Sequence, residues 1–148
     1  MKVIETVVRS GIAVAPDRPV HEVAAIMEAA GVGSLAIVDN GRLVGIVTDR
    51  DLVRRVVARR LPGDVRVDSV MTTPVVTIDG DADVTEVYEL FSTHAVRRLA
   101  VTRDGAFAGM VTVDDLLIRL SAQLSAVARP VTAELLFGHH EAPVPSLR

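Results

Sequence analysis

The sequence predicts an α/β (α+β) fold in which two pseudo-symmetric βαββα repeats pack face to face. The chain aligns with itself without a gap over 13–52 when it is shifted by 64 positions. In each copy, short apolar runs typical of strands alternate with apolar residues at helical spacing. Asn40-Gly41 and its counterpart Asp104-Gly105 lie between apolar runs, which indicates two tight β-hairpins.

The 64-residue offset matches turns, core positions and polar residues together. Identical pairs include Asp17/Asp81, Val20/Val84, Leu35/Leu99, Gly45/Gly109, Thr48/Thr112 and Asp51/Asp115. A single repeat leaves its sheet half covered, so two repeats must pack together to close a core. Pseudo-two-fold packing creates two equivalent clefts between the repeats, where small ligands usually bind.

Each repeat is predicted to hold a strand, a helix, a hairpin of two strands and a closing helix. Asp17 and Asp81 are expected to be the N-caps of the first helices. In repeat one the elements are 11–15, 19–30, 34–39, 43–48 and 49–60. In repeat two the first strand is 75–78, the first helix starts near 84, and the closing helix runs from 113 to about 128.

The domain organisation follows from these elements. We expect repeat one at 1–61, repeat two at 65–128 and a C-terminal tail at 129–148, with a Pro-Gly linker between the repeats. Arg129-Pro130 is expected to end the last helix, because proline cannot donate the next backbone hydrogen bond.

Composition excludes several classes of function. The chain has 148 residues, no cysteine and a net charge of −3, so disulfides and thiolate zinc sites are excluded and a polyanionic partner is disfavoured. With 3% aromatic residues it is poorly suited to stacking nucleic-acid bases. No signal-peptide core and no apolar run of membrane-spanning length is found. We therefore expect a cytoplasmic protein without membrane or nucleic-acid partners.

The candidate chemical motif is Gly-x-x-Thr-x-x-Asp, from Gly45 to Asp51 and again from Gly109 to Asp115. Glycine allows a flat ring to approach the backbone, threonine lies beside a helix N-terminus that favours phosphate, and aspartate can accept hydrogen bonds from ribose hydroxyls. The same spacing is also a helix capping box, in which the Thr48 hydroxyl accepts from the amide of Asp51. The spacing alone leaves both interpretations open.

A strand, a helix and a hairpin followed by Gly-Ile-Val-Thr-Asp-Arg-Asp-Leu at 45–52, present twice in tandem, resemble a pair of cystathionine β-synthase (CBS) domains. The resemblance covers about residues 4–122 and is closest to stand-alone bacterial CBS-domain proteins. It implies regulatory binding of an adenine ligand, namely AMP, ADP, ATP or S-adenosylmethionine. In that family the Thr and Asp hold ribose and phosphate, and adenine lies against the first strand.

Carried over residue by residue, the resemblance implies two ligand sites. Basic residues at the opening of the second strand often reach phosphate in that family. Copy two has Arg97-Arg98 at this opening, whereas copy one has Gly33-Ser34, so the two clefts are expected to be unequal. The implied ligand-binding residues are Ile12, Ala13, Thr48, Asp51, Val76, Thr77, Arg97, Arg98, Thr112 and Asp115.

No catalytic constellation stands out, so we expect no enzyme activity, no required cofactor and no metal site, including at His139-His140. The alternative function is a structural dimerisation or protein-interaction module that binds no nucleotide. Leu116, Leu117 and Leu120 lie at helical spacing beside Val113 and Leu124, and one isolated module could not bury both this face and that of the first helix, so we expect a homodimer. A sensor without a fused output domain also requires an effector protein, which the sequence does not identify.

Overall fold

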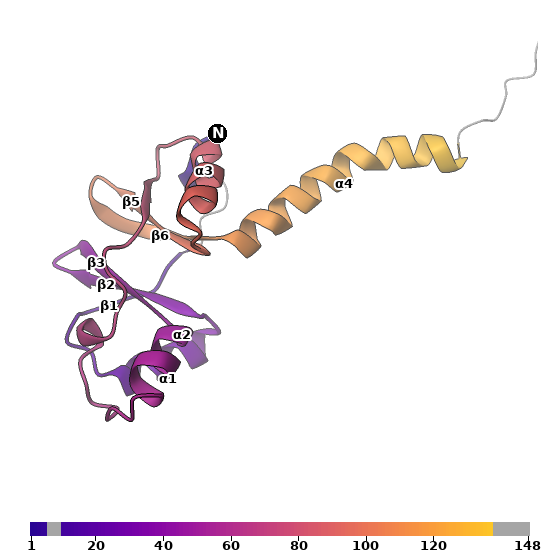
Figure 1. The fold of residues 1–148 in the computed structure, drawn as a ribbon. Coiled ribbons are helices and arrows are strands. Elements are labelled where there is room, and N and C mark those ends of the chain that lie inside the picture. Colours follow the sequence, from indigo (N-terminus) through magenta and orange to yellow (C-terminus); the bar gives the residue numbers. More distant parts are fainter. Residues whose placement is uncertain (6–9, 138–148) are drawn as a thin grey trace, which may run out of the picture. The chain divides into compact units, whose positions relative to one another are not determined.

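The fold is described from a computed structural model, which covers residues 1–5 and 10–137. The chain forms two compact units, Met1–Val113 and Asp114–Arg148. The first unit contains both hairpins and all the strands of the described residues, while the described part of the second is the helix α4 (Val113–Phe137) (Figure 1).

The order of elements confirms the predicted βαββα pattern in both copies. Short 3-10 helices, η1 (Val3–Glu5) and η3 (Val67–Ser69), lie in the leader segment of each repeat, ahead of its first strand. Repeat one contains β1 (Ala13–Val14), α1 (Val20–Ala30), β2 (Ser34–Asp39), β3 (Arg42–Thr48) and α2 (Asp49–Leu52), which continues as the π-helical segment η2 (Val53–Val57). Repeat two contains β4 (Thr77–Asp79), α3 (Val84–His94), β5 (Arg98–Arg103), β6 (Ala106–Thr112) and α4.

Within the described residues the strands form one six-stranded sheet in the order β1-β2-β3-β6-β5-β4. Both repeats use the same register, since Ala13 pairs with Ala36 and, 64 positions later, Thr77 pairs with Ala100. The two halves are joined at the centre by the pair Arg42 and Ala106. The duplication seen in the sequence is therefore reproduced in the backbone pairing.

Both hairpins turn where the sequence predicts. Asn40 and Gly41 have φ angles of 49° and 80°, and Asp104 and Gly105 have 52° and 78°. Two consecutive positive φ angles define the type I′ turn, whose twist matches that of the flanking strands. Asn, Asp and Gly adopt this conformation at the least cost, so the hairpin prediction is confirmed together with its physical reason.

Two apolar clusters hold the helices and strands together, one within repeat one and one between the two repeats. In repeat one, α1 packs Val23 and Met27 onto Leu35, Ile37 and Val47 of the hairpin. The second cluster joins the two repeats and contains Ile46, Ala100 and Met110, with Leu43, Val75 and Phe107 packed against it. The strands of the two repeats thus lie between α1 and α2 on one side and α3 on the other (Figure 1), which confirms the face-to-face packing.

The segments that lead into the repeats are exchanged between them. The Val67 amide, in the leader segment of repeat two, donates to the Arg18 carbonyl at 2.9 Å, and Val67 is fully buried in the core of repeat one. At the equivalent place, the Val3 amide donates to the Ala82 carbonyl at 2.9 Å, and Val3 is fully buried as well. Each repeat therefore takes one core residue from the segment that precedes the other.

This exchange also overturns the predicted helix caps. The N-cap of α1 is Pro19, with no side-chain bond, and the N-cap of α3 is Asp83, whose carboxylate accepts from the amide of Thr85. Backbone bridges from the leader segments hold Pro19 and Asp83 extended, so each helix starts one residue after its bridge. Asp17 and Asp81, two residues earlier, lie too far ahead to cap.

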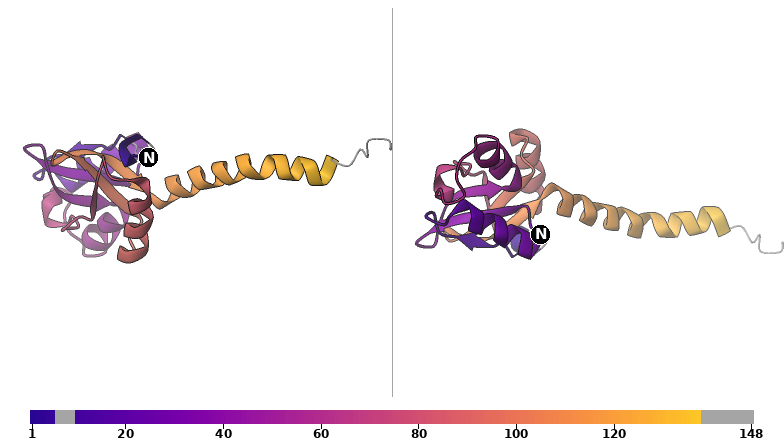
Figure 2. Two further views of the ribbon diagram at one scale, coloured as in Figure 1. Left: turned by 90° about the horizontal axis from the view of Figure 1, so that it is seen from above. Right: turned by 90° about the horizontal axis from the view of Figure 1, so that it is seen from below.

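The predicted ends of the closing helices were wrong in both repeats. In repeat one the helix ends with η2 at Val57, and Arg60 has a φ of +56° rather than a helical value. In repeat two, α4 continues through Pro130 to Phe137, as both views of Figure 2 show. Proline removes one hydrogen bond, but Ala133, Glu134, Leu135 and Leu136 beyond it are strong helix formers and favour a continued helix.

Candidate ligand-binding site

The motif threonine of repeat one lies where β3 ends and α2 begins. The Thr48 amide donates to Oδ2 of Asp51 at 3.0 Å, and the Asp51 amide donates to the Thr48 hydroxyl at 3.1 Å. These two reciprocal bonds form a capping box. Of the two interpretations that the spacing left open, the helix-capping one is therefore confirmed for Thr48 and Asp51.

The Asp51 carboxylate has partners beyond the cap. The Thr72 hydroxyl donates to it at 3.2 Å from Oδ1 and 3.3 Å from Oδ2, and the Arg55 guanidinium lies 4.0 Å from Oδ1. Arg55 also donates to the carbonyls of Val70 and Met71, at 3.0 Å and 2.8 Å. Only 13% of the Asp51 side chain is exposed. The nearly buried carboxylate thus links α2 to the segment that leads into β4 through the hydrogen bond from Thr72.

This carboxylate faces a pocket of about 260 Å³, which we call the inter-repeat pocket. The pocket has apolar walls with a few hydroxyls and charges, the usual composition of a small-molecule site. Five predicted residues line it: Thr48, Asp51, Val76, Arg97 and Arg98. Its remaining lining residues are Ile46, Thr72, Pro74, Val75 and Val96. The fold therefore brings residues of both repeats to one small cavity, with a carboxylate and two guanidinium groups.

The opening of the second strand differs between the repeats, and the two versions meet in space. A Cβ atom added to Gly33 would lie 3.0 Å from a terminal nitrogen of Arg98 and 3.2 Å from Oδ2 of Asp49. The Arg98 guanidinium therefore reaches from repeat two to the start of β2 in repeat one. Because Gly33 has no side chain, it leaves this path open.

Comparison with known proteins identifies the architecture. The family model described as CBS domain matches residues 4–58 and 67–122. The chain belongs to the CBS domain family. The uncharacterized protein YlbB of Bacillus subtilis is 42% identical over 99 residues, which are 66% of this chain and 67% of YlbB.

Solved CBS structures share the fold. A CBS domain protein from Pyrobaculum aerophilum, solved in complex with AMP, has a TM-score of 0.74 at 23% identity and covers 86% of this chain and 99% of its own. The CBS domain pair of the protein MJ0100, solved with 5′-methylthioadenosine and S-adenosyl-L-methionine, has a TM-score of 0.73 at 25% identity. Its alignment covers 83% of this chain and 98% of that pair.

The motif glycine of the first CBS repeat has a different role from the predicted one. A Cβ atom at Gly45 would lie 2.2 Å from the sulfur of Met71. The space beside Gly45 is therefore filled by the Met71 side chain and is not open to the ring of a ligand. An alanine at this position would have to displace the Met71 side chain, so the glycine leaves room for a core side chain and not for a ligand ring.

The other predicted residues lie outside the inter-repeat pocket. Ala13 pairs with Ala36 at the start of β1, and the Ile12 carbonyl accepts from the Ala36 amide at 2.9 Å. Thr77 is exposed on β4, and Thr112 ends β6 opposite Arg98. Asp115 lies in the first turn of α4, in the second unit. Their assignment to a second CBS ligand site remains a prediction.

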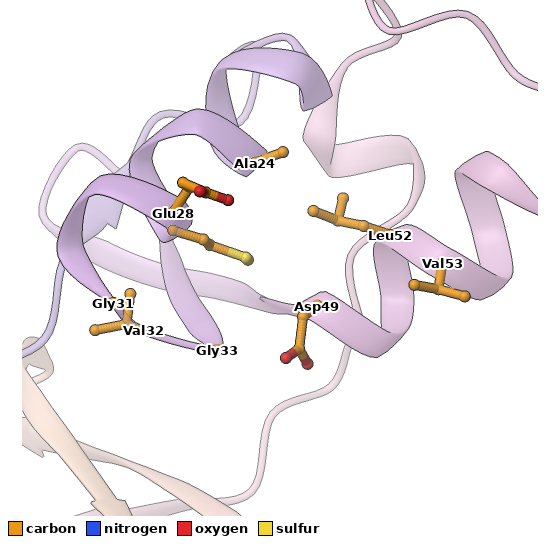
Figure 3. Close-up of a pocket in the computed structure, with 9 residues that line it drawn as sticks. Ala24, Glu28, Gly31, Val32, Gly33, Asp49, Leu52 and Val53 are labelled. Atoms are coloured by element: carbon orange, nitrogen blue, oxygen red, sulfur yellow. The ribbon is translucent and has the colours of Figure 1, made fainter.

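On the helical side of repeat one, a surface groove of about 560 Å³ lies between the end of α1 and the start of α2 (Figure 3). Leu52 and Val53 line it from one side, and Ala24 and Glu28 from the other. Val53 is 58% exposed. The groove thus has apolar walls from both helices, with the carboxylates of Glu28 and Asp49 also on its lining.

Sequence reasoning missed Thr72, Arg55 and the apolar walls of the pocket. Thr72 corresponds to Val8 at the 64-residue offset, so a comparison of the two CBS repeats gives it no weight. Within residues 1–5 and 10–137, no group of three His, Asp or Glu side chains is placed to hold a metal, and no helix combines the length and apolarity needed to cross a bilayer. His139 and His140 lie outside the described residues.

Proposed function

We propose that this protein is a regulatory, non-catalytic module that binds the adenosine part of an adenine ligand in the inter-repeat pocket. One observation carries the proposal: the pocket joins a nearly buried carboxylate, two threonine hydroxyls and two arginines within apolar walls from both repeats. AMP, ADP, ATP and S-adenosylmethionine all share adenosine. No cofactor is required, and we place the protein in the cytoplasm.

The chemistry of the pocket supports each part of such a ligand. An ionised carboxylate offers about four acceptor positions, and the Thr48 amide and Thr72 hydroxyl leave part of this capacity on Asp51 for ribose hydroxyls. Val75, Val76 and Ile46 provide apolar contact for a flat base. Arg97 and Arg98 provide positive charge for a phosphate. The volume of about 260 Å³ lies just below the usual range of ligand pockets, which favours the nucleoside part of a ligand over an extended phosphate chain as the occupant.

The related structures point in the same direction. The ligands named for the Pyrobaculum aerophilum protein and for MJ0100 are AMP, 5′-methylthioadenosine and S-adenosyl-L-methionine. All three contain adenine joined to ribose, whereas only AMP contains phosphate. This shared part supports adenosine recognition as the common property, with the arginines deciding between phosphate and sulfonium ligands.

The capping box favours a second candidate function, a structural dimerisation module. Thr48 and Asp51 already satisfy each other, so a helix cap alone would explain why both repeats contain the same pair. In either case we propose a homodimer formed through the helical side, where Val53 and Val57 are 58% and 70% exposed. We also propose that an effector protein binds this module and responds to whether its ligand is bound. Sedimentation showing a monomer at tens of micromolar would contradict the dimer.

Calorimetry and thermal melting separate the two functions. The full chain is titrated with adenosine, AMP, ADP, ATP and S-adenosylmethionine, with GMP as the control base. A ligand at 100 times its dissociation constant should stabilise the fold by about 2.7 kcal/mol. A melting shift with adenine ligands that GMP does not give supports the sensor, whereas no shift with any of them supports the structural module.

A further inference from the structure

The helix α4 carries a narrow apolar stripe, which we call the α4 seam. It consists of Leu117, Leu120, Leu124, Val127 and Val131, spaced alternately by three and four residues. This alternation is the a and d pattern of a coiled coil, with a period of 3.5 residues. Leu124, Val127 and Val131 are 69%, 72% and 53% exposed. Within the unit that contains α4, the stripe is therefore an exposed face with the pattern of a coiled coil.

The seam extends beyond what a CBS repeat requires. In repeat one the closing helix ends at Val57, whose equivalent at the 64-residue offset is position 121. The family match ends at residue 122, whereas α4 continues to Phe137. Residues 123–137 thus add about four helical turns that no element of the repeat explains. Isolated helices of this length are marginal in water, so this extension requires a packing partner.

The sequence of the helix selects the kind of partner. From 120 to 128 the positions beside the seam are small or polar, such as Ser121, Gln123 and Ala128, so the apolar stripe is narrow in the middle of the helix. Exposed apolar residues outside the seam lie only toward the two ends of the described helix, namely Ile118, Leu135 and Leu136. A helix that lies on a globular body or in a lipid surface has a wider apolar face, and lipid-bound helices are lined with basic residues. Here 113–137 contains only Arg119 and Arg129 as basic residues. No charge lies within the seam itself to repel an identical helix.

We propose that the α4 seam pairs with the α4 seam of a second copy of this chain, forming a short two-helix coiled coil. Identical faces are self-complementary about a two-fold axis, so one helix supplies both sides of the interface. Glu134, at the next d position, ends the seam by placing a charge there. The inference rests on the proposed homodimer and assigns it a second contact, separate from the helical side of repeat one.

Disulfide trapping tests the pairing directly, because the chain contains no cysteine. Single cysteines are placed in the full chain along the seam, as Leu120→Cys, Leu124→Cys, Val127→Cys and Val131→Cys, with Ala126→Cys and Ala133→Cys as controls on another face. Only residues with Cα atoms within about 7 Å can form the bond. At low micromolar concentration under mild oxidation, we expect at least one seam variant to become mainly a covalent dimer, while both controls stay mainly single chains.

Sedimentation then separates this inference from the homodimer itself. The pair L124E/V131E should raise the monomer–dimer dissociation constant at least tenfold, whereas A126E/A133E should leave it unchanged. A wild-type dimer whose seam cysteines crosslink no more than the controls overturns the seam pairing and leaves the homodimer standing. A wild-type monomer with no crosslinks overturns both. Crosslinking at the seam without an effect of AMP still supports the pairing, because the pairing does not depend on the ligand.

Discussion

Replacing Asp51 by asparagine separates ligand binding from helix capping. With its oxygen in the place of Oδ2, the asparagine can accept from both the Thr48 amide and the Thr72 hydroxyl, but it loses the negative charge that faces Arg55 at 4.0 Å. The weakening of these charge-assisted contacts should lower the free energy of unfolding by about 1 kcal/mol. For a chain of this size the melting temperature should fall by about 2–4 °C.

The effect on the ligand should be larger than the effect on the fold. Ribose hydroxyls that donate to a nearly buried carboxylate form charge-assisted bonds worth about 1.5–3 kcal/mol. Asp51→Asn should therefore weaken adenine-ligand binding about ten- to hundred-fold. Isothermal titration calorimetry measures the affinity, and differential scanning calorimetry measures the stability of the same preparation.

Asp83→Asn is the matched control. Asp83 also caps a helix, by accepting from the Thr85 amide at 2.9 Å, but it does not line the inter-repeat pocket. The control should melt earlier than the parent and bind ligand as tightly. If Asp51→Asn behaves like this control, with lower stability and unchanged affinity, the ribose role of Asp51 is refuted and the capping role alone remains.

Three further predictions follow from individual contacts. Arg98→Ala should weaken AMP binding about tenfold or more and leave adenosine binding unchanged, because only a phosphate requires the guanidinium; equal losses for both ligands would contradict this. Gly45→Ala should cost about 1–3 kcal/mol by colliding with Met71, and Met71→Ala in the same chain should remove most of that added cost in a double-mutant cycle. The Thr85 amide, and after it the Met1 amino group, lower the pKa of Asp83 from 3.8 to about 2. A pKa that is lower in the folded state than in the unfolded state stabilises the fold above about pH 4, and this contribution is lost as the pH falls toward 2. The difference in unfolding free energy between the parent and Asp83→Asn should therefore shrink from about pH 4 to about pH 2. A difference that stays constant over this range would contradict the prediction.

The hairpins and the duplication could be predicted because their causes are local. Asn40-Gly41 defines its turn through the φ angles those residues tolerate, and the 64-residue offset then carries the same register to β5 and β6. The helix caps could not be predicted, since bridges from distant leader segments set where α1 and α3 begin. The end of α4 could not be predicted from Pro130 alone. The proline removes one hydrogen bond, but the helix formers from Ala133 onward favour a helix beyond it.

The candidate site was predictable in part. Thr48, Asp51, Arg97 and Arg98 were singled out by motif and resemblance, and the fold brings all four to one pocket. Thr72 lies in an irregular segment with no repeated counterpart, so neither periodicity nor the offset could reveal its bond to Asp51. The role of Gly45 depends on Met71, which is distant in sequence and becomes a neighbour only after folding.

The exchange of leader segments has a consequence for how such a chain arises. A half-length ancestor with one repeat could bury its leader valine, the equivalent of Val3 or Val67, only in the core of another molecule. It would have been an obligate swapped dimer whose folding depended on concentration. Tandem duplication turns that association into an intramolecular event at a fixed effective concentration. Cutting the present chain between the repeats should therefore give two fragments that fold only when mixed.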